Sequence, residues 1–465
     1  MQTYSEASGA VLRAEADLSA RAGVAAGPVL RSYWQRIGGM PLAVSPATLP
    51  ARAAIAIIGG GFAGLATALR IKELQADADV VLIEAKSVGY GASGRNGGLM
   101  SPLPTPVWLA TALHDASHAR AIGLLEAQVR KAAAWAKAVA PGAEVTAQTL
   151  ALEAKGAITD AAIAHIARIL AKAGIGHELR EGATHAGQRS LSLPAHTINP
   201  YALVQGLAAR ARQLGVQIVE AAPVADVVQK DGHAHITLRD GRSMTAETVV
   251  IATNAYTPSL ALPEAPRAKV VHNYMLATEP LDRATLSRLQ HAGQCSGEFV
   301  VELNTAYVFY RLHQGRLVFG GIEKLRHTDG GDLDVPALVI AGLKSHLAAT
   351  LAGVGMPRIA DAWGGRFHMT STDLPIIRRS RQHPAMVWNL GYGGTGVALS
   401  LALAPIAAAR ALGRDVEDRA LADLDDAICN TRLPVAGALR FAAGVAGALV
   451  GGVMSRLAGN FGSAQ

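Results

Sequence analysis

A glycine-rich turn, GGGFAG (59–64), constrains the fold of this chain more than any other feature, because it lies between two short apolar runs. AIAIIGG (54–60) leads into it, and VVLIEA (80–85) follows a stretch with apolar residues at helical spacing. In such a turn the first glycine allows a tight bend, the second lets backbone approach a pyrophosphate, and the third lets helix and strand pack closely. The pattern predicts a βαβ unit that binds a dinucleotide at a helix N-terminus. A glycine turn without a ligand is the alternative.

Two features after this turn favour FAD over a nicotinamide dinucleotide. Glu84 lies 84 − 64 = 20 residues beyond Gly64, where a carboxylate can accept hydrogen bonds from ribose hydroxyls. The loop GYGASGRNGG (89–98) then places five glycines in ten residues, and its free backbone donors can face phosphates and a ring edge. A nicotinamide dinucleotide needs no second loop here, whereas the longer FAD does. A flexible surface loop is the alternative interpretation.

We expect an α/β fold, in which a Rossmann-like FAD-binding domain is joined to a discontinuous α+β substrate domain made of an antiparallel sheet and helices. The alanine-rich region 106–190 is expected to be helical, and YVFYRLHQGRLVFGGIE (307–323) alternates like a hairpin. The turn GYGGTG (391–396) is expected to open into one long helix. The expected units are an N-terminal extension (1–50), the FAD-binding domain (51–105, 191–260 and 365–430), the substrate domain (106–190 and 261–364) and a C-terminal helix (431–465).

Charge and cysteine content exclude several classes of function. The net charge is +7 without a run of five like charges, so we expect a solvated surface and no nucleic-acid partner. Cys295 and Cys429 are far apart and lack metal-ligand spacing, so we expect no metal site and a cytoplasmic location, and the N-terminus lacks the pattern of a signal peptide. The apolar segment 441–454 is too short to span a bilayer. We expect a docked C-terminal helix, with a peripheral membrane contact as the alternative.

Six motifs in order resemble the D-amino-acid oxidase type of FAD-dependent oxidoreductases. They are GGGFAG, the acid at 84, GYGASGRNGG, TVVIATNAY (248–256), TDLPIIRR (372–379) and GYGGTG. Within this family, the SYW segment (32–34) and the ASGRNGG loop are similar to the gamma-glutamylputrescine oxidase branch. The resemblance covers residues from about 30 to 455. It is strong for the cofactor segments and weak between 106 and 190.

The resemblance implies non-covalent FAD and gives each motif a role. The first turn would wrap the pyrophosphate, the acid would hold the adenosine ribose, and the 89–98 loop would follow the phosphates and the flavin ring. The late turn would end at a helix N-terminus whose dipole favours negative charge on the reduced flavin. The implied cofactor residues are Gly59, Gly61, Phe62, Ala63, Gly64, Glu84, Ala92, Ser93, Asn96, Gly97, Gly98, Val224, Thr253, Asn254, Gly393, Gly394, Thr395 and Gly396. A plain core valine is the alternative for Val224.

Three positions depart from the amino-acid oxidases of this type. Glycine oxidase and D-amino-acid oxidases place a carboxylate-binding arginine where this chain has Phe367, and the neighbouring Arg366 is expected to point to the opposite face of an extended segment. Monomeric sarcosine oxidase places a carboxylate-binding lysine where this chain has Ala398. Its oxygen-activating lysine corresponds to Val318, which leaves oxygen and a quinone as alternative electron acceptors. We therefore expect an amine substrate without an adjacent carboxylate.

These departures predict an enzyme that oxidises the C–N bond of an amine, γ-glutamylputrescine-like or another primary or secondary amine, by hydride transfer to flavin. The resulting imine would hydrolyse, and no general base is assigned. Two alternatives are a quinone-linked secondary or N-methyl amino-acid dehydrogenase for sarcosine- or glycine-like substrates, and a non-catalytic FAD-binding subunit. Aromatic side chains can surround an alkylamine, although each one is more often part of a core. The candidate substrate residues are Tyr256, Tyr274, Tyr310, Trp363 and His368.

Overall fold

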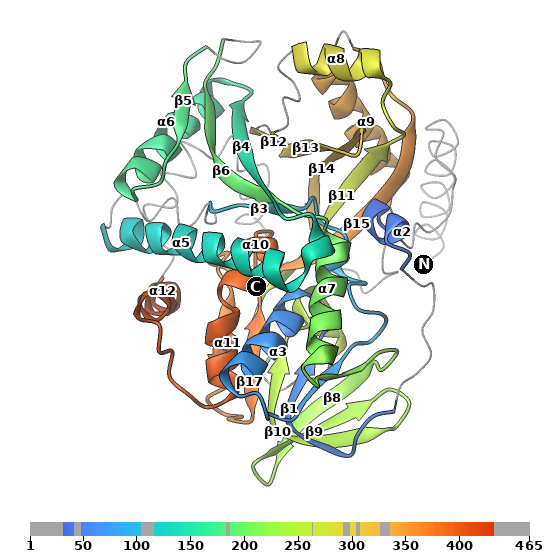
Figure 1. Ribbon diagram of the computed structural model, residues 1–465, viewed down its shortest axis with the longest axis vertical. Helices are drawn as coiled ribbons and strands as arrows, with labels where there is room; N and C mark the ends of the chain where they lie inside the picture. The colour runs from blue at the N-terminus through green and yellow to red at the C-terminus, as the bar shows by residue number, and fades with distance from the viewer. Residues whose placement is uncertain are drawn as a thin grey trace, which may run out of the picture.

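The computed structural model describes residues 31–40, 48–103, 116–182, 187–262, 264–291, 298–303, 307–325, 335–352 and 354–431. They form two β-sheets, which Figure 1 shows one above the other with helices between and around them. The predictions for residues 1–30 and 432–465, and for Cys295, lie outside the described residues.

The first sheet contains the predicted βαβ unit. In spatial order its strands are β16 (Ile376–Arg379), β17 (Met386–Leu390), β10 (Ser243–Ile251), β1 (Arg52–Ile58), β2 (Val80–Ile83) and β7 (Gln217–Val219), with the hairpin of β8 (Val224–Lys230) and β9 (His233–Leu238) attached to β10. The strands from β17 to β7 are parallel. Both faces are buried, which explains their continuous apolar runs. Ile57 packs in the cluster that includes the adjacent helix, and Ile58 packs with the hairpin side chains.

Helices cover one face of this sheet (Figure 1). They are α3 (Phe62–Leu74), α7 (Pro200–Gln213) and α11 (Ala404–Ala411). The N-terminus of α7 is capped as its sequence suggests, since the Asn199 side chain accepts a hydrogen bond from the Ala202 N–H at 3.1 Å. The expectation of a single long helix after residue 396 is wrong. α10 (Gly396–Ala402) ends at Leu403 and α11 then begins, because Pro405 has no N–H to continue the helix.

The second sheet is mostly antiparallel. In spatial order its strands are β15 (Ile359–Met369), β11 (Lys269–Thr278), β14 (Arg316–Leu325), β13 (Val308–His313), β12 (Phe299–Leu303), β4 (Thr146–Ala154), β6 (Ser190–Thr197) and β3 (Leu99–Met100), with β5 (Glu178–Arg180) paired to β6. β13 and β14 form the predicted hairpin. The described residues also place α6 (Ala157–Lys172), α8 (Arg283–His291) and α9 (Ala337–Thr350) around this sheet (Figure 1). The expected combination of a Rossmann-like domain and an α+β domain is confirmed.

Several expected details of the domain division differ from the structure. Strand β6 pairs with β4 and β3, so residues 190–197 belong to the second sheet and not to the FAD-binding domain that was expected to include 191–260. Likewise, β15 continues to Met369, four residues beyond the expected boundary at 365. The segment 106–190 is not purely helical, because β4 forms the centre of it. Strand pairing, which joins segments far apart in the chain, decides these boundaries.

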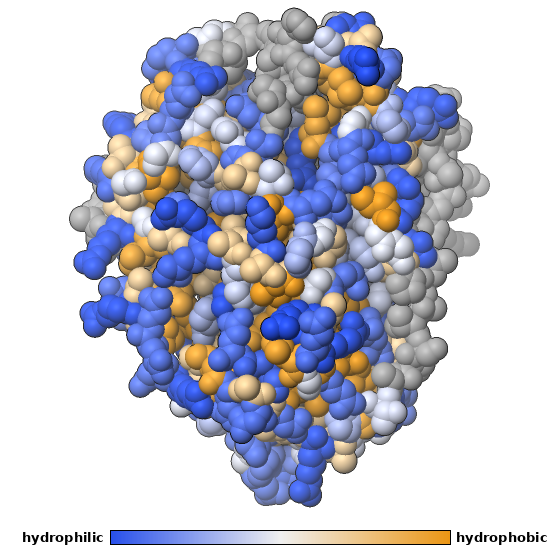
Figure 2. Space-filling view, in the orientation of Figure 1, coloured by the Kyte–Doolittle hydropathy of each residue, from blue (hydrophilic) through white to orange (hydrophobic). Residues whose placement is uncertain are grey.

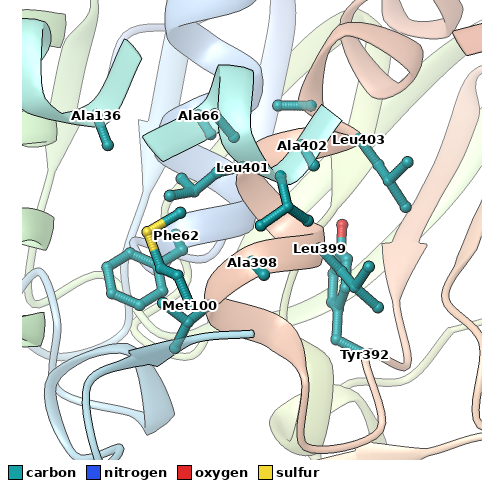
Figure 3. Packing of buried hydrophobic residues seen from close by; sticks show 14 of the residues in the cluster. Phe62, Ala66, Met100, Ala136, Tyr392, Ala398, Leu399, Leu401, Ala402 and Leu403 are labelled. Carbon is teal, nitrogen blue, oxygen red and sulfur yellow. The ribbon is translucent and has the colours of Figure 1, made fainter. Parts of the chain in front are cut away.

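One apolar cluster joins the two sheets. Figure 3 shows Phe62 of α3, Met100 of β3 and Ala398 of α10 in this cluster, together with Ala136 of α5 (Ala116–Val139). All four side chains are buried. The cofactor half and the second sheet therefore share a core. Helix α12 (Arg419–Asn430) packs against α5 on the outside.

Within the described part of the chain, no helix has the length and apolar character needed to cross a membrane. On the face in Figure 2, hydrophilic residues predominate and apolar residues occur in small groups between them.

We expect Gly64→Ala to destabilise the protein by about 2 kcal/mol or more, because a Cβ at this position would lie 2.0 Å from the Gly59 carbonyl oxygen. The measurement is the urea-unfolding midpoint of the purified protein. Gly176→Ala is the matched control, since a Cβ there meets nothing within 4 Å. Equal midpoints for the two variants would contradict the close packing of α3 on β1.

Candidate active site

A cavity of about 1020 Å³ is lined by residues of both sheets. All of the predicted cofactor residues line it except Gly64 and Gly98. Gly64 instead supports the packing of α3, and Gly98 has φ +78° and lies against the Ile198 carbonyl oxygen. The structure therefore brings together motifs that are more than 300 residues apart in sequence, from Gly59 to Gly396 (396 − 59 = 337).

The first glycine turn forms at the carboxyl end of β1. Gly59 has φ +117°, and a Cβ there would lie 2.6 Å from the Ala252 carbonyl oxygen, so only glycine fits. Gly61 precedes the first residue of α3, and a Cβ on it would lie 2.8 Å from Ser93 Oγ. Phe62 N–H donates to Ser93 Oγ at 2.9 Å. The turn thus presents a narrow backbone surface and a helix N-terminus to the cavity, which suits a pyrophosphate.

Glu84 follows β2 and is held by backbone donors. Its Oε2 accepts from Gly60 N–H at 2.7 Å and its Oε1 accepts from Lys86 N–H at 2.9 Å. Burial raises the pKa of the Glu84 carboxyl, and these backbone hydrogen bonds oppose that rise. Each carboxylate oxygen keeps further capacity to accept hydrogen bonds, as ribose hydroxyls require. The residues present therefore fit the adenosine end of FAD.

The 89–98 loop is held from inside by Asn96. The Asn96 Nδ2 group donates to the Ala92 carbonyl at 3.0 Å, and its Oδ1 accepts from Gly98 N–H at 2.8 Å. A short 3₁₀ turn, η1 (Ala92–Gly94), lies between these contacts. The loop is thus a defined structure rather than a flexible surface segment.

A short N-terminal segment holds the same loop from outside. We call residues 32–37, which comprise the Ser32 cap and α2 (Tyr33–Ile37), the N-terminal clasp. Gln35 Nε2 donates to the Gly89 carbonyl at 2.8 Å, Ser32 Oγ donates to the Gly94 carbonyl at 2.6 Å, and Trp34 Nε1 donates to the Asn96 carbonyl at 2.9 Å. The sequence alone showed only that this SYW segment resembles the gamma-glutamylputrescine oxidase branch. Its hydrogen-bonding role depends on tertiary contacts.

Only Tyr256 among the five candidate substrate residues lines the cavity. Tyr274 and Tyr310 pack instead in the outer cluster with α9, and the Tyr310 ring stacks on Phe319 at 5.9 Å between centroids. The reason is strand alternation, because neighbouring side chains on a strand point to opposite faces. Here Met275 and Phe309 face the cavity in their place.

Trp363 and His368 also lie outside the cavity lining. Trp363 is fully buried, and its Nε1 donates to the Arg95 carbonyl at 2.8 Å, so it supports the 89–98 loop. His368 is 2% exposed, and burial lowers the pKa of its imidazole. Its carbonyl accepts from Gly393 N–H at 3.2 Å, which holds the late glycine turn. The prediction that these two side chains contact substrate is therefore corrected.

Sequence reasoning missed an aromatic wall on the second sheet. It consists of Phe299, Tyr307 and Phe309. The Phe299 and Phe309 rings stack at 5.9 Å with an interplanar angle of 17°, and Tyr307 meets Phe309 edge-on at 6.4 Å. Further apolar side chains continue the wall: Leu150, Leu152, Met275, Val301 and Leu303. The alternation in YVFYRLH contained this information, but the face toward the cavity needed the structure.

Arg366 and Phe367, which were expected to point to opposite faces of an extended segment, both line the cavity. They belong to β15, which is an edge strand of the second sheet. The Arg366 guanidinium lies over the Tyr256 ring at 4.0 Å from its centroid. Tyr256 belongs to η3 (Asn254–Ser259) of the cofactor half, so this pair crosses between the two halves.

The other positions whose roles came from the family resemblance differ in whether they line the cavity. Val318 and Ala398 are 1% and 2% exposed and do not line the cavity. Val224 does line it, which fits the expected adenine contact. Asn254 has φ +44°, and its Oδ1 accepts from Gly391 N–H at 3.1 Å, so it joins η3 to the late turn. Among the described residues, no group of three or more potential metal ligands occurs.

Comparison with known proteins gives the family. A model described as FAD dependent oxidoreductase matches residues 54–410. The chain belongs to this family. FAD as cofactor and an oxidoreductase activity, both expected from the motifs, are therefore confirmed.

Individual relatives are distant. The chain is 26% identical to the probable oxidoreductase OrdL of Haemophilus influenzae over 408 residues, which cover 83% of this chain and 89% of that protein. It is 27% identical to the gamma-glutamylputrescine oxidoreductase of Escherichia coli over 370 residues, which cover 74% and 80%. Its fold is similar to that of glycine oxidase from Geobacillus kaustophilus, with a TM-score of 0.65 and 17% identity over 79% of this chain and 96% of that one.

We expect Glu84→Gln to weaken FAD binding by about tenfold to a hundredfold. Both carboxylate oxygens accept from backbone N–H groups, so an amide NH₂ would face one of these donors. Titration of the apoprotein with FAD, followed by flavin fluorescence, measures the change. Glu247→Gln, an exposed position on β10, is the control. An unchanged dissociation constant for Glu84→Gln would contradict the assigned role.

Proposed function

We propose that this FAD-dependent oxidoreductase oxidises the C–N bond of an amine that has no carboxylate beside the reacting carbon. A γ-glutamylputrescine-like amine is the first candidate, in keeping with the name of the Escherichia coli relative. The observation that carries the proposal is the aromatic wall beside Gly97. A Cβ at Gly97 would lie 2.9 Å from Phe309 and 3.4 Å from Phe299, so the two rings border the loop expected to line the flavin.

The aromatic wall suits an alkylamine in two ways. Its faces attract the methylene groups of the substrate, and a cationic end of the substrate can lie over a ring. The apolar surroundings also disfavour the ammonium form, so the neutral amine, which is the reacting form, is favoured. Tyr307 is 38% exposed, and we assign it to the entrance of the cavity. The reacting amine, being neutral, thus needs no charged side chain in this wall.

The carboxylate clamps of the amino-acid oxidases have no counterpart at the expected positions. Phe367, which stands where the amino-acid oxidases are expected to carry an arginine, lines the cavity. Ala398, which stands where sarcosine oxidase is expected to carry a lysine, is buried and does not line the cavity. Bound FAD would supply the acceptor for a hydride from the carbon beside the nitrogen, and the product would be an imine that water hydrolyses. The protein's own residues orient the substrate, exclude water from the reacting face and hold the loop that borders the cofactor.

We expect amines without an adjacent carboxylate to reduce the bound flavin in the absence of oxygen. γ-Glutamylputrescine and N-acetylputrescine should bleach the flavin absorbance, and glycine and sarcosine should not.

We expect Phe309→Leu to lower the rate of flavin reduction at low substrate concentration about tenfold, because a ring of the aromatic wall is lost. Tyr310→Phe, on the opposite face of the same strand, is the control. Reduction by glycine or sarcosine alone would overturn the proposal.

A second candidate is a quinone-linked amino-acid dehydrogenase, and Arg366 is the observation that favours it. This arginine lines the cavity and could bind a carboxylate. A separate turnover assay identifies the acceptor: peroxide formed in air indicates oxygen, and dye-linked turnover without peroxide indicates a quinone.

Substitution of Arg366 separates the two candidates. Under the amine proposal, we expect Arg366→Met to change kcat/KM for N-acetylputrescine by less than about threefold, because this substrate has no carboxylate to pair with the guanidinium. An amino-acid dehydrogenase would instead lose roughly a hundredfold in kcat/KM for sarcosine, as expected when a charge-assisted pair is removed. Arg358→Met is the control, since Arg358 pairs only loosely with Glu279 on the surface. Steady-state assays with both substrates give the answer.

A further inference from the structure

Arg311 is a buried cation directly behind the 89–98 loop. It lies on β13, two residues from Phe309 and therefore on the same face of the strand, and it is 5% exposed. Its Nη2 donates to the Ile198 carbonyl at 2.7 Å, and its Nη1 lies 3.5 Å from the Gly98 carbonyl. The guanidinium also lies over the Trp34 ring of the N-terminal clasp, at 4.9 Å.

No carboxylate among the described residues forms an ion pair with this guanidinium, and its Nε has no hydrogen-bond partner there. Glu144, whose charge acts on it most strongly, is instead hydrogen-bonded to His313 at 2.8 Å. Burial lowers the pKa of Arg311 to about 10, so it remains charged at neutral pH. Glu144 acts on this buried charge without forming an ion pair with it, so an anion in the cavity would stabilise the charge further.

The guanidinium does not line the cavity but contacts the loop that borders it. A Cβ at Gly98 would lie 2.9 Å from Arg311 Nη2, so the side chain is in direct contact with this residue of the loop. The adjacent Gly97 lines the cavity. The positive charge is thus one residue behind the wall that the motifs assign to the flavin ring. A unit charge acting over roughly 10 Å at an effective dielectric of about 20 changes an equilibrium by about tenfold.

We propose that Arg311 is a positioning residue whose unpaired positive charge makes the bound FAD easier to reduce. Reduction adds two electrons and one proton to the cofactor, which leaves one net negative charge, and the nearby cation favours that charge. The electrons come from the substrate or from an added reductant, and Arg311 keeps its proton. This inference rests on FAD binding and not on the identity of the substrate, so its test needs no substrate.

The alternative for Arg311 is a purely structural role, in which its N–H groups only donate hydrogen bonds to the Gly98 and Ile198 carbonyls. Two substitutions separate charge from hydrogen bonding. Arg311→Lys keeps the charge, and Arg311→Gln keeps amide donors but loses the charge. Arg316→Gln is the matched control: Arg316 lies on the neighbouring strand β14, contacts the Tyr33 ring and donates to the Thr278 carbonyl.

The experiment is an anaerobic redox titration of each holoenzyme against a reference dye. At a fixed solution potential we expect the ratio of reduced to oxidised cofactor to fall about tenfold in Arg311→Gln, and by less than about threefold in Arg311→Lys and Arg316→Gln. Equal falls in the Lys and Gln variants would overturn the proposal in favour of the structural role. A fall in Arg311→Gln no larger than that in Arg316→Gln would overturn it as well.

The absorbance spectrum of the reduced wild-type holoenzyme provides a second test if the Gln variant does not fold or retain FAD. At pH 6, where free reduced FAD is mostly neutral, we expect the spectrum of the anionic reduced flavin in the wild type and a larger share of the neutral form in Arg311→Met, because the helix N-terminus at Gly396 is the same in both. The neutral form in the wild type, or equal spectra for the two proteins, would overturn the proposal.

Discussion

Hydrogen bonds to the backbone of the 89–98 loop hold the two halves of the molecule around one cofactor site. Gln35 of the N-terminal clasp donates to the Gly89 carbonyl, and Trp363 of the second sheet donates to the Arg95 carbonyl. The Gly98 carbonyl accepts from Ile198 N–H at 2.9 Å. A loop with five glycines has few side chains to pack, so donors from distant segments add to the order that the Asn96 side chain supplies from within. The site therefore depends on the tertiary fold as much as on the motif.

The alternation of side chains along the strands of the second sheet divides the aromatics into two sets. Phe309 faces the cavity, whereas Tyr310 packs outward against α9 and the stack with Phe319. A shift of one residue exchanges these faces, which is why reasoning from residue type selected the wrong set. The apolar and aromatic character of this cavity wall follows from the set that packs inward.

Three charged side chains in and around the cavity have different surroundings. Backbone N–H groups hold the Glu84 carboxylate where ribose hydroxyls can donate to it. Arg366 lies over the Tyr256 ring, and Arg311 lies behind Gly98 without an ion pair. Buried charges in such positions act over the low-dielectric interior more strongly than surface charges would.

The sequence by itself determined the cofactor half: GGGFAG, the acid at 84 and the 89–98 loop predicted FAD and a Rossmann-like domain, because their contacts form within a continuous stretch of chain. It also led us to expect, at Phe367 and Ala398, no counterpart to the carboxylate-binding cations of the amino-acid oxidases. Only the tertiary structure decided that β6 joins the second sheet, that Trp363 supports the loop, and that Phe309 rather than Tyr310 faces the cavity. The reason is physical: strand pairing and the choice of buried face depend on distant segments that local sequence patterns do not specify.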